Sequence, residues 1–211
     1  NLMTTSDSNI EKTLYEVSSI IHDSKNLNEI FKKLGVIIKD SIGIKNFYVA
    51  LINWELDLIT FPYYQDIKDH SPKEKFSSGK GMTNYAIKKN VQILINQKEY
   101  QKLINTNIVE AIGTAPYYWL GTPLKDCTQS VIGLIVIQTY NKKVTFKKDH
   151  IKLMNFISEQ LTLAIERFDH IKEVEHLTYY DPLTELPNKS LFFEEGNKMI
   201  SDMQKEYFIA C

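Results

Sequence analysis

A glycine-rich stretch from residue 77 to residue 83, SSGKGMT, has residue types that can cradle a phosphate group. A phosphate-binding loop needs two glycines five residues apart, followed by lysine and then serine or threonine. Here Gly79 and Gly81 are only two residues apart and Lys80 lies between them. The spacing therefore predicts a loop that enters a short helix, with Gly81 relieving backbone strain.

The five histidines give no pattern typical of a metal site. Only His170 has carboxylates at helical spacing, in Glu166 and Glu173. Such pairs are typical of solvated helix faces, whereas a zinc site needs at least three protein ligands. The chain also lacks a G-x-S-x-G nucleophile motif. We therefore expect no metal, no cofactor and no enzymatic activity in this segment.

The composition is that of an ordinary globular protein, with 43% hydrophobic residues, 24% charged residues and a net charge of −1. A nearly neutral chain has no strong field to attract nucleic acid or an anionic membrane, so we expect neither partner. The longest apolar run, residues 131–137, is too short to span a bilayer. Two cysteines, Cys127 and Cys211, give no disulfide framework, which favours a cytoplasmic location.

The spacing of apolar residues predicts the secondary structure. Steps of three and four predict helices at residues 9–21 and 23–43. Runs of β-branched and aromatic residues predict one strand pair within 45–64 and another within 115–141. A short helix at 82–90 and a strand at 91–96 are expected between them. Hairpins at both ends favour an α+β fold, in which helices pack on an antiparallel sheet of about six strands.

A long helix is predicted from Lys147, because no glycine or proline occurs before Pro182. Its apolar residues alternate in steps of three and four, as in the seam of a coiled coil. We expect this seam to join two protomers in a parallel homodimer, with an apolar stripe of the N-terminal helix completing a bundle. The expected dimer residues are Leu14, Val17, Ile157, Leu161, Ala164, Phe168 and Ile171.

Residues 10–168 resemble the GAF domain family. The most specific matches are the strand WLGTPL, the strand VIGLIVIQTY and the end of the long helix, LTLAIER, in the order and spacing of that family. The resemblance implies a sensory domain that binds a small molecule, still unidentified, between its sheet and the short helix and loops after the second strand.

The resemblance also indicates where such a pocket would lie. If side chains alternate along the strand from Tyr118 to Leu124, the face carrying Tyr118 and Thr122 is the one this family turns towards its ligand. The expected pocket residues are Phe61, Tyr63, Phe76, Tyr85, Tyr118 and Thr122. The alternative is a packed core in which the aromatic residues only bury area.

Two known ligand classes of the family are less favoured. The cyclic-nucleotide signature N-K-(x)n-F-x-x-x-D-E is matched only in part by NKKVTFKKDH, in which Asp149 comes one residue early and His150 replaces the glutamate. These residues are expected to form the turn before the long helix. Covalent bilin attachment needs a cysteine near the pocket, and Cys127 lies in a predicted hairpin turn.

The segment HLTYYDPLTELPNKSLF resembles the start of a GGDEF domain, the diguanylate cyclase module with the pattern D-x-L-T-x-L-x-N-R. The matching residues are Asp181, Leu183, Thr184, Leu186 and Asn188. Glu185 stands where glycine is common, and Lys189-Ser190 where two arginines are common. The resemblance implies an output domain that uses GTP and Mg²⁺ to make cyclic di-GMP. Its signature loop and metal-binding carboxylates would lie beyond Cys211, so the segment is expected to be a truncated start.

These observations predict four parts: an N-terminal dimerisation helix at 1–24, a GAF sensory domain at 25–168, a signalling-helix linker at 169–180, and the start of a GGDEF domain at 181–211. The leading hypothesis is a cytoplasmic sensor that controls a diguanylate cyclase through a dimeric helix. The alternative hypothesis is a dimerisation scaffold without ligand, attached to a degenerate or hybrid output that degrades or binds cyclic di-GMP.

Overall fold

The computed structural model describes residues 5–72, 75–76, 78–181, 184–186, 188–189, 191 and 193, and the side chains of these residues except 5–9 and 75–76. The helices in this part of the chain are α1 (Thr5–Asp23), α2 (Leu27–Ile42), α3 (Met82–Lys89), α4 (Gln97–Asn105) and α5 (Lys148–Tyr179). The strands are β1 (Asn46–Asn53), β2 (Leu58–Gln65), β3 (Lys75–Phe76), β4 (Ile93–Asn96), β5 (Tyr118–Lys125) and β6 (Val131–Thr139).

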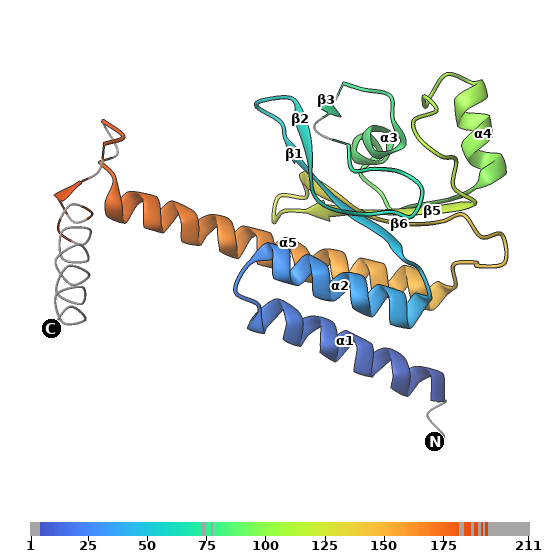
Figure 1. Ribbon diagram of the computed structural model, residues 1–211, viewed down its shortest axis with the longest axis horizontal. Coiled ribbons are helices and arrows are strands. Elements are labelled where there is room, and N and C mark those ends of the chain that lie inside the picture. The colour runs from blue at the N-terminus through green and yellow to red at the C-terminus, as the bar shows by residue number, and fades with distance from the viewer. Residues whose placement is uncertain are drawn as a thin grey trace, which may run out of the picture. The chain divides into compact units, whose positions relative to one another are not determined.

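The strands form one antiparallel sheet in the order β3-β2-β1-β6-β5-β4. The first hairpin pairs β1 with β2, the last pairs β5 with β6, and β1 joins the two hairpins by pairing with β6. Strands far apart in the sequence therefore lie at the centre of the sheet (Figure 1). This arrangement confirms the predicted α+β fold with an antiparallel sheet and a long last helix.

Helices cover both faces of the sheet (Figure 1). α2 and the first half of α5 lie along one face, which we call the helix face, and α1 packs against α2. α3 and α4 lie on the other side, the cavity face. The central strand β6 is buried on both faces, with Ile135 and Ile137 on one face and Leu134 and Val136 on the other. Such continuous apolar runs are expected in strands that are covered on both sides.

Local signals set the ends of α2. The Asn26 side chain accepts a hydrogen bond of 2.9 Å from the backbone N–H of Glu29, which satisfies one donor of the first turn. Gly43 ends the helix with a φ of 79°, a left-handed conformation that glycine adopts without steric cost. The helix between these caps places Phe31, Leu34 and Ile38 in the core.

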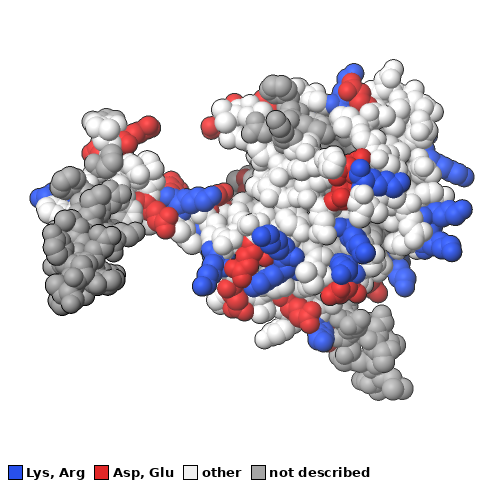
Figure 2. Space-filling view, in the orientation of Figure 1, with Lys and Arg blue, Asp and Glu red and all other residues white. Residues whose placement is uncertain are grey.

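The charges on the surface are mixed. Figure 2 shows acidic and basic side chains interspersed over α1 and α2, which agrees with the net charge of −1. Among the helices in the described part of the chain, none combines the length and the apolar character that a membrane span requires.

The chain divides into two compact units, Asn1–Ile165 and Glu166–Cys211, and α5 runs through the division. In the first unit, α5 contributes to the core below the sheet. In the second unit, its residues Ile171, Val174 and Leu177 are each 45–62% exposed. The domain boundaries expected from the sequence remain predictions.

The expected dimer seam on α5 is wrong for its first three residues. Ile157, Leu161 and Ala164 are at most 1% exposed, because they lie in the core of their own protomer. Val17 of α1 is likewise fully buried, and Leu14 is half-buried. A helix that packs on a sheet needs the same three- and four-residue steps as a coiled coil, so the spacing alone does not distinguish the two. Phe168 and Ile171 lie in the second unit, where Phe168 is half-buried.

Charge substitutions on α5 test this correction. Leu161→Glu places a carboxylate in the core and is expected to lower the free energy of unfolding by more than about 3 kcal/mol. Leu163→Glu, on the exposed side of the same helix, is the matched control and is expected to change it by less than about 0.5 kcal/mol. Urea denaturation followed by circular dichroism measures both. Equal stability of the two variants would contradict the packing of α5 on the sheet.

Candidate functional site: an aromatic cavity on the sheet

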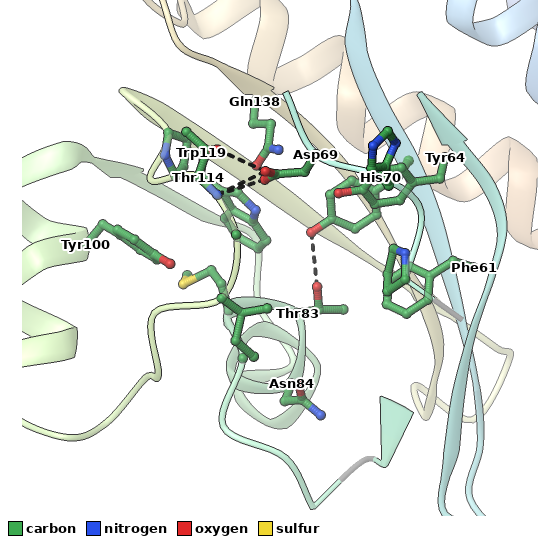
Figure 3. A pocket seen from close by; sticks show the side chains of 17 residues that line it. Phe61, Tyr64, Asp69, His70, Thr83, Asn84, Tyr100, Thr114, Trp119 and Gln138 are labelled. Atoms are coloured by element: carbon green, nitrogen blue, oxygen red, sulfur yellow. Dashed lines mark hydrogen bonds between the residues drawn. The ribbon is translucent and has the colours of Figure 1, made fainter. Parts of the chain in front are cut away.

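A cavity of about 200 Å³ lies on the cavity face, between the sheet, the start of α3 and the loops before β3 and β5. Five aromatic side chains from four elements line it: Tyr48, Phe61, Tyr64, Tyr100 and Trp119. Figure 3 shows Phe61, Tyr64 and His70 on one side, Trp119 and Tyr100 on the other, and Thr83 and Asn84 contributed by α3. The cavity is therefore lined by both strands and loops.

The register of β5 and β6 decides which side chains reach the cavity. Trp119 pairs with Gln138 and Gly121 with Val136, and paired residues share a face of an antiparallel sheet. Trp119 and Gln138 both line the cavity. Thr122 pairs with Ile135 on the opposite side and lies beside Asn155 and Ser158 of α5.

Gly121 makes room for the Trp119 ring. A Cβ atom at position 121 would collide with the outer edge of that ring, which lies directly over the glycine. Glycine in a strand often marks such a close approach. Trp119 is only 2% exposed, and its ring extends along β5 to form one wall of the cavity.

A bulge in the first hairpin brings Phe61 and Tyr64 to the same cavity. Val49 pairs with Tyr63, but Leu51 pairs with Thr60, so Phe61 and Pro62 together oppose one residue of β1. The extra residue reverses the alternation of side chains along β2. Phe61 and Tyr64 therefore contact Tyr48 with ring centroids 6.0 and 5.2 Å away, respectively.

The start of α3 forms the lower wall in Figure 3. Gly81 precedes the helix in extended conformation without a side-chain cap, and a Cβ atom there would lie 3.0 Å from Asn84 Oδ1. Thr83 is buried, and its hydroxyl is 3.0 Å from the Tyr48 hydroxyl, so the two share a hydrogen bond. Burial raises the pKa of Tyr48 to about 12, which keeps this phenol neutral at physiological pH.

Two aspartates hold residues 66–72, the described part of the loop that follows β2 and covers the cavity. We call this segment the covering loop. Asp69 accepts hydrogen bonds from the backbone N–H and the hydroxyl of Thr114, each 2.9 Å long, which join this loop to the loop before β5. Asp66 accepts from the Gln138 amide at 2.7 Å and from the Tyr140 hydroxyl at 3.0 Å. Burial, and then the Asp66 carboxylate, raises the pKa of Tyr140, so its hydroxyl remains a donor.

Asn46 adds a third connection at this end of the sheet. Its amide donates to the Gln138 carbonyl at 3.0 Å, and its oxygen accepts from the N–H of Ile67 at 3.0 Å. These bonds tie β1, β6 and the covering loop together. Because buried polar groups are costly unless they are paired, the network favours one position of this loop.

The structure places one expected pocket residue, Phe61, in the cavity. Three others lie elsewhere. Tyr63 packs on the helix face against Phe31 and Phe47, and Thr122 faces α5. Tyr118 lies on the same face, because it pairs with Thr139 and stands two residues before Leu120, which pairs with Ile137 on that face. The Tyr118 ring contacts Phe146. Side chains alternate along β5 as expected, but the face that carries Tyr118 and Thr122 is the helix face, so the expected ligand-facing side of β5 is wrong.

Of the remaining two expected pocket residues, Tyr85 is not among the described residues that line the cavity. Tyr85 packs against the core of the cavity face and lies 5.6 Å from the Lys89 ammonium. Phe76 is in β3, and its side chain lies outside the described residues.

Sequence reasoning missed most of the cavity residues: Tyr48, Tyr64, Asp69, Thr83, Tyr100, Trp119 and Gln138. Tyr48 and Trp119 are hidden in apolar strands. The sequence WLG does indicate the position of Trp119. A glycine two residues after the tryptophan lies on the same face of the strand and leaves room for the large ring.

In the GGDEF-like segment, hydrogen bonds join several of the described residues that follow α5. Asp181 Oδ1 accepts hydrogen bonds from the N–H of Thr184 at 2.9 Å and from its hydroxyl at 3.1 Å. Asn188 donates its side-chain amide to the Thr178 carbonyl and its N–H to the Tyr179 carbonyl, both at 2.8 Å. Glu185 has a φ of 56°, a left-handed conformation in which glycine is favoured.

Two further expected coupling residues belong to this segment. Leu186 is exposed, and its carbonyl accepts from the N–H of Asp181 at 2.8 Å. Leu183 lies outside the described residues. The helix ends at Tyr179, as the proline at 182 predicts.

No cluster of three His, Cys, Asp or Glu side chains that could hold a metal ion occurs among the residues the structure describes. His170 and Glu173 are 3.7 Å apart on an exposed helix face. Cys127 is exposed in the turn between β5 and β6 and does not line the cavity.

Comparisons with known proteins find solved structures that are similar to this chain. No protein-family model and no curated protein matches the sequence. The GAF domain of a phosphoenolpyruvate-protein phosphotransferase from Coxiella burnetii has a TM-score of 0.66 and 11% identity, covering 79% of this chain and 98% of that chain. The GAF domain of the corresponding Acinetobacter protein has a TM-score of 0.65 and 13% identity, covering 80% and 98%.

A free methionine-R-sulfoxide reductase from Neisseria meningitidis, solved with its substrate, has a TM-score of 0.64 and 11% identity, covering 81% of this chain and 96% of that chain. Together these likenesses show that this chain has the GAF-domain fold.

Enlarging Gly121 tests how the cavity wall is built. Gly121→Ala is expected to lower the free energy of unfolding by about 1–3 kcal/mol, because the added methyl group displaces the Trp119 ring. In a Trp119→Leu background the same change should cost much less. Urea denaturation of the four proteins in this double-mutant cycle measures the difference. A cost independent of residue 119 would contradict the close approach of the ring.

Proposed function

We propose that this chain is a cytoplasmic sensory domain that binds a small molecule in the aromatic cavity and transmits binding through α5. The observation that carries the proposal is the cavity itself. It combines apolar rings with a few fixed polar groups, as ligand sites do. A domain that served only to fold would gain stability by filling this space.

The size and lining of the cavity limit the ligand. At about 200 Å³ it is below the usual range of roughly 300–1,000 Å³ for drug-sized ligands, so a bilin or a cyclic nucleotide is too large for it as it stands. None of the described lining residues is a cysteine that could attach a chromophore, and none is a lysine or arginine that could neutralise a phosphate.

A route for the signal runs through the sheet. Trp119 and Gln138 line the cavity, and their neighbours Leu120 and Ile137 are buried on the opposite face, where α5 packs. A ligand that moves β5 or β6 therefore changes the surface on which α5 rests. The ligand can shift the position of α5 by no more free energy than the difference between its affinities for the sheet before and after this movement.

We extend the proposal to the output. The match of Asp181, Thr184 and Asn188 to the GGDEF pattern supports a diguanylate cyclase domain after α5, which would use GTP and Mg²⁺ in a homodimer. The bonds that Asp181 and Asn188 make at the end of α5 support a role in fixing how the next domain begins.

A second candidate is a dimerisation scaffold that needs no ligand. The exposed apolar residues Ile171, Val174 and Leu177 of α5 favour it, because a helix in water gains by covering such residues with a partner helix. In that case the output would be a degenerate or hybrid cyclic di-GMP domain, and the cavity would have no effect on it.

Filling the cavity separates the two candidates. Thr83→Phe extends a ring into the cavity, and Thr145→Phe, on an exposed loop, is the matched control. In the full-length protein that contains this chain, we expect Thr83→Phe to change cyclic di-GMP production from GTP and Mg²⁺ by at least about fivefold.

Thr145→Phe should leave that rate within about twofold of the unmodified protein. An active cyclase that is unaffected by Thr83→Phe would contradict the sensory role and support the scaffold. A full-length protein that makes no cyclic di-GMP would overturn the proposed output.

A further inference from the structure

We propose that the cavity takes a small organic ammonium ion, of the alkylated type found in choline, as its ligand. This inference deepens the proposed sensory function and depends on it for its biological meaning. It is argued from the rings, charges and hydrogen bonds of the cavity lining.

The rings supply the first attraction. Tyr48, Phe61 and Tyr64 form a cluster in which all three ring centroids lie 5.2–6.2 Å from one another, and they contact the cavity together. Trp119 lies on the other side (Figure 3). The face of an aromatic ring carries partial negative charge and attracts a cation within about 6 Å of its centroid. An ammonium ion between these walls would contact rings on two sides.

The ionisable groups favour the same sign of ligand. The Asp69 carboxylate lines the cavity, and Asp66 lies next to it, bound to the lining residue Gln138. Burial is the largest cause that raises the pKa of Tyr64, and the neighbouring Tyr48 and the two carboxylates raise it further.

The described residues that line the cavity carry little positive charge. Among the described lining residues, His70 is the one basic side chain, and it is exposed. Lys68 belongs to the covering loop, but its ammonium group lies 4.7 Å from the centroid of the Tyr140 ring, and the residue does not line the cavity.

The hydrogen bonds of Asp69 hold its carboxylate in place at the cavity wall. Its two oxygens share the N–H of Thr114, and one of them also accepts the Thr114 hydroxyl, while the Tyr140 hydroxyl, 3.4 Å from Asp69, lies closer to Asp66. A carboxylate has about four acceptor positions, so Asp69 can still accept an N–H donor, and the preference for an alkylated ammonium depends on the rings. An alkylated ammonium needs no acceptor and gains from charge and ring contact alone.

The start of α3 suits the rest of such a molecule. The N-terminal end of a helix carries partial positive charge, and the residue at the N-cap position, Gly81, has no side chain that could cap it. This end would repel an ammonium group but favour a hydroxyl or carbonyl oxygen. A ligand with an ammonium head and a short oxygen-bearing tail therefore matches both ends of the cavity.

Choline and its uncharged isostere dimethylbutanol, in which carbon replaces nitrogen, test the inference with almost the same shape. Isothermal titration calorimetry on the whole 211-residue chain measures both, with acetate as the anionic probe. We expect choline to bind about tenfold more tightly than dimethylbutanol and acetate not to bind detectably.

Two variants locate the effect. Asp69→Asn removes the charge but keeps an acceptor for Thr114, and Tyr64→Leu removes a ring but keeps apolar volume. Each should weaken choline binding roughly fivefold and leave dimethylbutanol within about twofold, which also shows that the cavity is intact. Asp40→Asn, on the exposed side of α2, is the control for charge and should change neither affinity.

Equal affinity for choline and dimethylbutanol, preference for acetate, or no detectable choline binding would overturn the inference. If choline fails but Thr83→Phe still changes cyclic di-GMP production, the ammonium assignment falls and the sensory function stands. If choline binds as expected but Thr83→Phe leaves production unchanged, the binding site stands and the sensory function falls.

Discussion

The burial of the central strands on both faces is the constraint on which the rest of the structure depends. β1, β5 and β6 carry large apolar residues on both sides, so each face must be covered. On the helix face, aliphatic side chains of α2 and α5 do this by close packing. On the other face, rings and loops do it, and their shapes leave the cavity. The candidate site is thus a consequence of covering one face with aromatic residues.

Hydrogen bonds to two carboxylates hold the described part of the loop over the cavity. Asp66 and Asp69 accept bonds from three elements, and Gln138 and Asn46 complete the network. A network of this kind stabilises one loop position strongly when every member is paired and weakly when one partner is lost. A ligand that competes for Asp69 or Gln138 would therefore act on the loop and the sheet together.

Much of the fold could be predicted from the sequence, because it depends on periodicity. The helices, the two hairpins and the end of α5 before Pro182 follow from spacing and from proline chemistry. The site could be predicted only in part. In β5 both faces are apolar, so alternation does not show which face Thr122 takes. In β2 a bulge at Phe61 and Pro62 brings Tyr64 and not Tyr63 to the cavity. A proline inside a strand is a local sign of a bulge, but it does not show which residues follow on each face. The spacing of Ile157, Leu161 and Ala164 fits a core and a dimer equally well.

If the space beside Trp119 binds a small cation, as proposed, the fluorescence of Trp119 reports on binding directly. Replacing Trp54, which is 54% exposed in the turn after β1, with phenylalanine leaves Trp119 as the one tryptophan. Titration of this variant with choline should give a saturable change in emission that fits the calorimetric affinity and disappears when Thr83→Phe is added. An emission that does not change, or changes equally in the filled variant, would contradict the account.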